Sequence, residues 1–143
     1  MIRRLLSAGL FTVLIAATAC GGGSTTTAPS TSVGVYTQTD LVLGTGATAV
    51  AGNSITVAYT GWLYDTSKAD GKGNQFDSQS SIQFQIGVGK LIKGWDQGIP
   101  GMKVGGQRRL IIPPDLAYGS TSPSSSIPPN ATLVFDIKLL SVP

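Results

Sequence analysis

Histidine and glutamate are absent from this 143-residue sequence, and cysteine occurs once, at Cys20. Without histidine there can be no Ser-His-Asp triad, no Cys-His pair and no histidine-ligated metal. A single cysteine excludes an internal disulfide and a cysteine-rich metal cluster. All seven acidic residues are aspartates, and none pair at a spacing that indicates a metal or glycosidase site. We therefore expect no metal and no cofactor, and any chemistry must work without an imidazole or a nucleophile.

The charge balance gives little support to a nucleic-acid partner. Ten basic residues against seven acidic ones give a net charge of +3. Arg3 and Arg4 lie in a segment that we expect to be removed, which leaves eight basic residues against seven acidic ones. Binding to a phosphate backbone needs a clustered basic surface, whereas Arg108 and Arg109 form the only adjacent basic pair in the remaining chain. We expect no nucleic-acid partner.

Residues 1–19 are typical of an export signal. Arg3 and Arg4 precede an apolar stretch, residues 5–19, that is shorter than the roughly 20 residues of a membrane span. Ala17 and Ala19 fit an ordinary signal-peptidase site, while Cys20 directly after them resembles the lipobox of bacterial lipoproteins, with Ala17 where leucine is usual. Because a free cysteine is a liability outside the cytoplasm, we favour a lipidated Cys20 as the only membrane anchor, in the periplasm or cell envelope. A soluble periplasmic or secreted protein is the alternative.

Residues 20–32 differ in composition from the chain on either side. They consist of small, uncharged residues and carry no large apolar side chain. Such a segment cannot bury enough surface to offset the entropy of ordering. We expect a flexible tether, followed by one folded domain over residues 33–143.

The pattern of apolar residues in this domain predicts a small α+β fold. Residues 55–60, 82–86, 108–112 and 132–140 are rich in β-branched residues or alternate apolar with polar, which is typical of strands. Residues 91–98 place Ile92, Trp95 and Ile99 at helical spacing before Pro100 and Gly101, which favours one short helix. We expect an antiparallel sheet packed on this helix.

Three stretches, in order, resemble the FKBP family of prolyl isomerases. The first contains Val-Ala-Tyr-Thr-Gly at 57–61 and Phe-Asp-Ser at 76–78. The second is Ile-Lys-Gly-Trp-Asp-Gln-Gly at 92–98 with Gly-Met-Lys-Val-Gly at 101–105, and the third is Pro-Pro-Asp-Leu-Ala-Tyr-Gly at 113–119 with residues 127–136. The resemblance implies a twisted antiparallel β-sheet wrapped over one short α-helix, and peptidyl-prolyl cis-trans isomerase activity on proline-containing polypeptides. It also implies binding of macrolide inhibitors.

The same resemblance implies a set of site residues. In the family, the substrate proline lies in an aromatic cavity between helix and sheet, where the backbone amide matching Ile92 and the hydroxyl matching Tyr118 hold carbonyls of the peptide. The catalytic positions correspond to Tyr59, Asp77 and Tyr118. The substrate-binding positions correspond to Phe76, Ile82, Leu91, Ile92, Trp95, Ile127 and Phe135.

The sequence departs from the family pattern after Phe-Asp-Ser. Residues 78–81 form a short segment without the arginine that supports the aspartate in well-known members, and Ile82 replaces an aromatic residue. The loop at 64–75 is longer than in minimal members. A catalytically weak proline-binding module or a chaperone is therefore the alternative function. Only residues 119–126 separate Tyr118 from Ile127, too few for an inserted chaperone domain, and no N-terminal dimerisation helix is evident, so we expect a monomer.

Overall fold

The computed structural model describes residues 35–143, so the expected export signal, the whole of the expected tether with Cys20, and residues 33 and 34 of the expected domain lie outside the described residues. The described elements, in chain order, are β1 (Thr37–Val42), β2 (Ser54–Tyr64), β3 (Lys72–Gln85), α1 (Lys93–Gly98), β4 (Gln107–Ile112), the single 3₁₀ turn η1 (Pro114–Leu116) and β5 (Leu133–Ser141).

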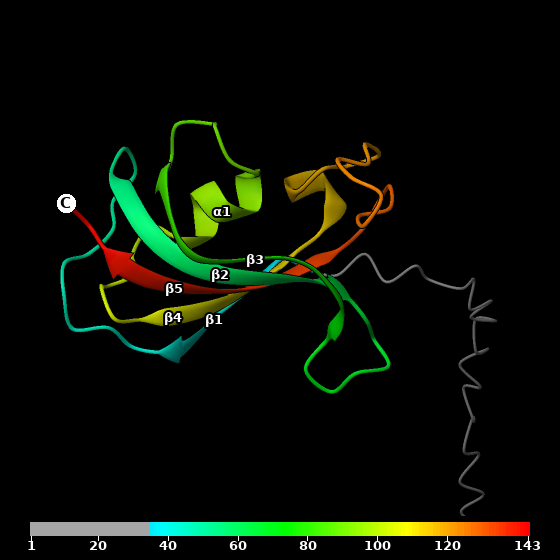
Figure 1. Cartoon of the computed structure of the whole chain (residues 1–143), viewed down its shortest axis with the longest axis horizontal. Coiled ribbons are helices and arrows are strands. Elements are labelled where there is room, and N and C mark those ends of the chain that lie inside the picture. The colour runs from blue at the N-terminus through cyan, green and yellow to red at the C-terminus, as the bar shows by residue number, and fades with distance from the viewer. Residues whose placement is uncertain (1–34) are drawn as a thin grey trace, which may run out of the picture. The chain divides into compact units, whose positions relative to one another are not determined.

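The five strands form one antiparallel sheet in the order β1-β4-β5-β2-β3. Figure 1 shows this sheet twisting and curving, with α1 lying against one of its faces. The two central neighbours, β2 and β5, pair over most of their length, from Thr56 opposite Ser141 to Leu63 opposite Leu133. The structure therefore confirms the predicted fold class of a twisted antiparallel sheet with one short helix.

The core lies between α1 and the sheet face that it covers. In β5 the alternate residues Leu133, Phe135, Ile137 and Leu139 are each at most 3% exposed, as expected when one face of a strand is buried. Trp95 of α1 is 4% exposed and belongs to the same cluster of buried residues. Burial of this apolar surface is the main force that holds α1 on the sheet.

Two elements differ from the sequence-based expectation. The edge strand β1 was not predicted, because all six of its residues are exposed and no apolar alternation marks it. Strand β3 begins ten residues earlier than the predicted strand at 82, so it includes the segment 78–81 and residues 72–75 of the expected loop, and Tyr64 at the start of that loop belongs to β2. Backbone pairing with β2, from Lys72 opposite Tyr64 to Gln79 opposite Tyr59, produces the extra length, and this tertiary interaction leaves no signal in such a polar sequence.

Arg108 joins β4 to β1 and to the end of α1. The side chain of Arg108 is 9% exposed, and its Nε donates to Asp40 Oδ1 at 2.6 Å. Its Nη1 donates to the Gly98 carbonyl at 2.7 Å and, more weakly, to the Pro100 carbonyl at 3.4 Å. The hydrogen bonds from Arg108 hold the pKa of Asp40 below its ordinary value. One guanidinium thus fixes the edge strand and the helix end to the same point of the sheet.

Asp136 of β5 forms a second ionic cluster. Arg109 Nε donates to its Oδ1 at 2.7 Å, and Lys72 Nζ donates to its Oδ2 at 2.7 Å. The same Lys72 ammonium lies 4.1 Å from the centre of the Trp62 ring, within the range of a cation–π contact. Burial would raise the pKa of Asp136, but the hydrogen bonds from Arg109 and Lys72 outweigh this and lower it.

We expect the domain to lose stability in acid through Asp40 and Asp136. Both carboxyls have a pKa below the unfolded value in the folded state, so below about pH 4 the unfolded chain binds more protons than the folded one. Melting temperatures should be nearly constant from about pH 5 to 8 and fall as the pH drops towards 3. The Asp136→Asn variant should melt lower at pH 7 and lose less on acidification. Equal melting temperatures of the native protein at pH 7 and pH 3 would contradict this.

Candidate active site

An aromatic cavity of about 230 Å³ opens between α1 and the sheet. It is lined by residues from β2, β3, α1, β5 and two connecting segments: Tyr59, Phe76, Asp77, Phe84, Lys90, Leu91, Ile92, Trp95, Tyr118 and Phe135. We call this space the aromatic cavity. Six of its ten lining residues are aromatic, so an apolar ring that enters the cavity leaves water.

Trp95 lies at the centre of the aromatic cluster. Its ring meets those of Tyr59, Phe135 and Phe84 edge to face, with centroids 5.0, 5.2 and 5.4 Å apart. Phe76 continues the cluster by packing edge to face on Phe135 at 5.5 Å. Edge-to-face contacts of this kind are favourable beyond the area that they bury, and they restrict each ring. The packed rings therefore form the most restrained part of the cavity wall.

Asp77 is held in place by two hydrogen bonds. The Tyr59 hydroxyl donates to its Oδ2 at 2.5 Å, and the Ser78 backbone N–H donates to its Oδ1 at 2.8 Å. These donors hold the carboxylate without an arginine. Burial and the hydrogen bond to Asp77 raise the pKa of Tyr59, and burial with the Asp77 charge raises that of Tyr118. Both phenols remain protonated donors at neutral pH.

Among the donors at the cavity that have no acceptor within residues 35–143, two are placed to bind a peptide backbone. The backbone N–H of Ile92, at the N-terminal boundary of α1, makes no hydrogen bond there, while the Ile92 carbonyl accepts from Trp95 N–H at 3.0 Å. The hydroxyl of Tyr118, a side chain that is 37% exposed, also makes none. Polar groups at a binding site that lack an internal partner are available to a ligand. An amide and a hydroxyl are suited to hold carbonyl oxygens of a peptide.

The segment before α1 is held by Asp96. Its two carboxylate oxygens accept the backbone N–H groups of Gly87 at 2.8 Å and Gly89 at 3.0 Å. Both glycines have positive φ, 73° and 76°, which other residues rarely adopt. A helix residue thereby fixes the loop that presents Lys90, Leu91 and Ile92 to the cavity.

Eight of the ten domain residues expected at the site line the aromatic cavity: Tyr59, Phe76, Asp77, Leu91, Ile92, Trp95, Tyr118 and Phe135. Ile82 and Ile127 do not line it. Ile127 is 6% exposed and belongs to the buried core, and Ile82 packs against that core. Sequence reasoning missed Phe84, two residues beyond Ile82 along β3, and Lys90. The period of two along a strand was the signal that could have indicated Phe84.

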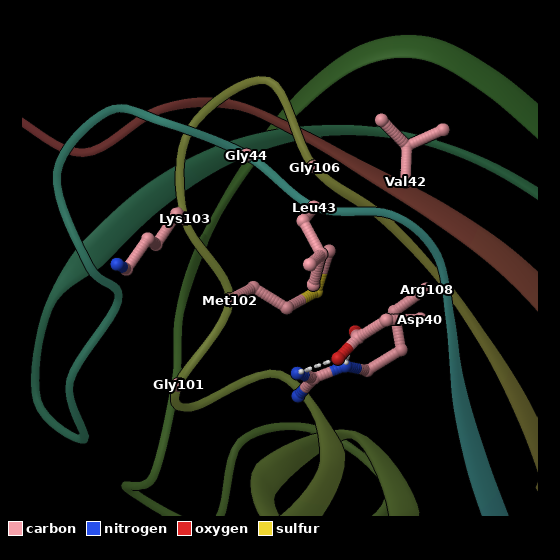
Figure 2. Close-up of a pocket in the computed structure, with 9 residues that line it drawn as sticks. All are labelled: Asp40, Val42, Leu43, Gly44, Gly101, Met102, Lys103, Gly106 and Arg108. Carbon is pink, nitrogen blue, oxygen red and sulfur yellow. Dashed lines mark hydrogen bonds and ion pairs between the residues drawn. The ribbon is translucent and has the colours of Figure 1, made fainter.

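A second cavity, of about 170 Å³, lies where β1 and β4 meet the segment after α1. Figure 2 shows the Asp40–Arg108 ion pair at its side, with Leu43, Met102 and Lys103 among its other lining residues. None of the residues expected at the site lines this second cavity.

Within residues 35–143, no group of three or more histidine, cysteine or acidic residues could hold a metal ion. No helix of the same part is long and apolar enough to cross a membrane.

The sequence is similar to several proteins named FK506-binding protein. The FKBP_C family, described as FKBP-type peptidyl-prolyl cis-trans isomerase, matches residues 46–140. The FK506-binding protein of Neisseria meningitidis serogroup A is 47% identical over 103 residues, covering 72% of this chain and 92% of the relative. FK506-binding protein 1B of Neurospora crassa is 48% identical over 101 residues, covering 68% of this chain and 89% of the relative.

Solved structures agree with these sequence matches. The crystal structure of AtFKBP13 superposes with a TM-score of 0.62 at 41% identity, covering 76% of this chain and 93% of the other. A peptidyl-prolyl cis-trans isomerase from Pseudomonas syringae pv. tomato superposes with a TM-score of 0.63 at 33% identity, covering 75% of this chain and 74% of the other. With the fold, the aromatic cavity and the sequence matches in agreement, the chain belongs to the family of FKBP-type peptidyl-prolyl cis-trans isomerases.

Proposed function

We propose that this chain catalyses the cis-trans isomerisation of X-Pro peptide bonds in polypeptides. The observation that carries the proposal is the aromatic cavity, which places Trp95 among other rings and two free donors at its border. The proline ring would lie over Trp95. The Ile92 N–H and the Tyr118 hydroxyl would each donate to a carbonyl of the bound peptide.

The reaction needs no covalent step. Rotation about a peptide bond faces a barrier of about 18–20 kcal/mol because the C–N bond has partial double-bond character. Unaided, X-Pro bonds isomerise in tens to hundreds of seconds, which is slow enough to limit folding. A chain without histidine and without a free nucleophile can therefore still be an isomerase, provided that it binds the twisted amide better than the planar one.

The aromatic cavity supplies such differential binding. In the twisted amide resonance is lost, so its carbonyl is less polar than that of the planar form. Surroundings that exclude water destabilise the planar ground state more than the twisted state. The rings of Trp95, Phe76 and Phe135 provide these surroundings, while hydrogen bonds at the border hold the flanking backbone against the rotation.

Isomerase assays on proline-containing peptides test the proposal. We expect acceleration well above the spontaneous rate. Combining Tyr118→Phe with Asp77→Ala should lower kcat/KM by about tenfold to a hundredfold, since each change removes a polar group worth roughly a factor of three to ten. Ser125→Ala, at an exposed residue of the loop after Tyr118 whose hydroxyl makes no hydrogen bond within residues 35–143, is the control and should leave kcat/KM unchanged. If the native protein is no faster than the double variant, the chain is a proline-binding module and not an isomerase.

Two features of the wider function rest on the sequence and the relatives. The similarity to proteins named FK506-binding supports binding of macrolide inhibitors in the aromatic cavity. The pattern of residues 1–20 supports export, with lipidation of Cys20, and hence action on exported polypeptides. The mass of the mature N-terminus separates a lipidated Cys20 from an unmodified one.

A further inference from the structure

Lys90 places a positive charge on the aromatic cavity that nothing in the described chain neutralises. Within residues 35–143, two charged residues line the cavity, Lys90 and Asp77. The Asp77 carboxylate already accepts hydrogen bonds from the Tyr59 hydroxyl and the Ser78 N–H. Lys90 is exposed, and within residues 35–143 its ammonium makes no ion pair and no hydrogen bond. The cation is thus free to meet a group that a substrate brings.

The backbone at Lys90 is fixed relative to the helix. Lys90 directly follows Gly89, whose N–H is bonded to Asp96 of α1, and it precedes Leu91, which also lines the cavity. Both carboxylate oxygens of Asp96 accept hydrogen bonds from the loop, one from the N–H of Gly87 and the other from the N–H of Gly89. The nearby acidic side chain therefore anchors the loop and forms no ion pair with Lys90. A lysine on an anchored loop extends its flexible side chain from a fixed backbone position beside the cavity.

We propose that the site prefers X-Pro segments with an acidic side chain, aspartate or glutamate, on one flank of the proline, and that Lys90 determines this preference. The inference rests on the proposed function and names its substrate class. We expect this preference on one flank of the proline only. Asp77 also lines the cavity, and its carboxylate repels an acidic side chain on the flank that lies nearer to it.

The expected effect is moderate and sensitive to salt. Ion pairs between exposed groups change an equilibrium by about twofold to fivefold. Their attraction is screened within about 3 Å at 1 M salt but extends to about 30 Å at 0.01 M. A preference that comes from the Lys90 charge must therefore be largest in dilute buffer and disappear in concentrated salt.

The experiment compares peptides that differ only in charge. One pair carries glutamate or glutamine directly before the proline, and a second pair carries them directly after it. Exchange between cis and trans forms is followed by nuclear magnetic resonance, which needs no coupling protease. For one of the two pairs, the glutamate peptide should be isomerised with a kcat/KM about two to five times that of the glutamine peptide in dilute buffer. In about 1 M salt the two should be equal.

Three variants assign the preference to one side chain. Lys90→Gln should abolish the difference between glutamate and glutamine, and Lys90→Glu should reverse it. Lys103→Gln removes the same charge from another exposed lysine, which lines the second cavity and not the aromatic one, and it should keep the native preference. Equal rates for both peptide pairs in dilute buffer, or a preference that survives Lys90→Gln, would overturn the inference.

The outcomes also separate this inference from the proposed isomerase activity. If the glutamine peptides are isomerised and the glutamate peptides show no advantage, the isomerase stands and the role of Lys90 falls. If no peptide is isomerised, the proposed isomerase activity is wrong. The preference for acidic peptides is then tested by measuring how tightly the same peptides bind. Quenching of tryptophan fluorescence reports that binding, because Trp95 lines the cavity. Tighter binding of a glutamate peptide that is lost in Lys90→Gln supports the inference, whereas equal dissociation constants overturn it.

Discussion

Replacing Gly61 by alanine is expected to lower isomerase kcat/KM on the order of a hundredfold, because displacement of binding groups by about 1 Å has effects of that size. Gly61 lies in β2 beneath the aromatic cavity. A Cβ at this position would lie 2.6 Å from Cζ of Phe76 and 2.8 Å from Cε1 of Phe135. Both rings line the cavity and pack on each other, so neither can move without reshaping it.

The same change should also reduce stability, by about 1–3 kcal/mol, because extra volume in a packed core forces neighbours from their preferred rotamers. Chemical denaturation gives this free energy, and circular dichroism establishes that the variant is folded when its rates are measured. Thr60→Ala, at the preceding residue of the same strand, is the matched control. It removes only an exposed hydroxyl contact with Ser78 and should leave activity unchanged. A kcat/KM for Gly61→Ala within threefold of the native value would show that Phe76 and Phe135 are not rigidly placed.

Arg108→Ala is expected to destabilise the domain by about 3 kcal/mol. The substitution leaves the Gly98 carbonyl at the end of α1 without its donor and removes the partner of Asp40. Losses of 3–5 kcal/mol are usual when a buried pair is broken, and the lower end applies because the Asp40 side chain is 38% exposed and can be rehydrated. Unfolding in urea measures the loss.

The neighbouring arginine provides the control for this prediction. Arg109 is also paired with an aspartate of the sheet, but its side chain is 23% exposed, and Asp136 keeps Lys72 as a second partner when Arg109 is removed. Arg109→Ala should therefore be clearly less destabilising than Arg108→Ala. Arg108→Lys, which keeps the charge but not the planar fork, should fall between the native protein and Arg108→Ala. Equal losses for the two alanine variants would contradict the bridging role of Arg108 between β1, β4 and α1.

Much of the fold could be predicted because its central strands carry strong local patterns. Residues 132–140 alternate so regularly that β5 and its buried face followed directly, and Trp95 with Ile99 marked the apolar side of the helix. The edge strand β1 could not be predicted in this way. Its six residues are exposed, and what makes it a strand is its pairing with β4, about seventy residues later in the chain.

The residues of the aromatic cavity likewise divide into those that the sequence could predict and those that it could not. Eight of its residues were expected at the site, because they lie in motifs that resemble the family. Phe84 was not expected there, because the family resemblance matched Ile82 to the site. Ile82 and Phe84 both belong to the same alternation of apolar and polar residues in β3. The register between β2 and β3 shifts between Val57 and Tyr59, so the depth at which each β3 side chain meets the cavity depends on an irregular pairing.

The sequence by itself determined that chemistry here proceeds without histidine, that the domain is an antiparallel sheet with one short helix, and that it resembles prolyl isomerases. These conclusions depend on composition and on patterns within a few residues. Only the tertiary structure decided that Phe84 and Lys90 line the cavity, that Tyr59 and Ser78 hold Asp77 without an arginine, and that Arg108 joins β1 to α1. Each of these contacts depends on strand register and on packing between elements far apart in the chain, and no local pattern of residues encodes such distances.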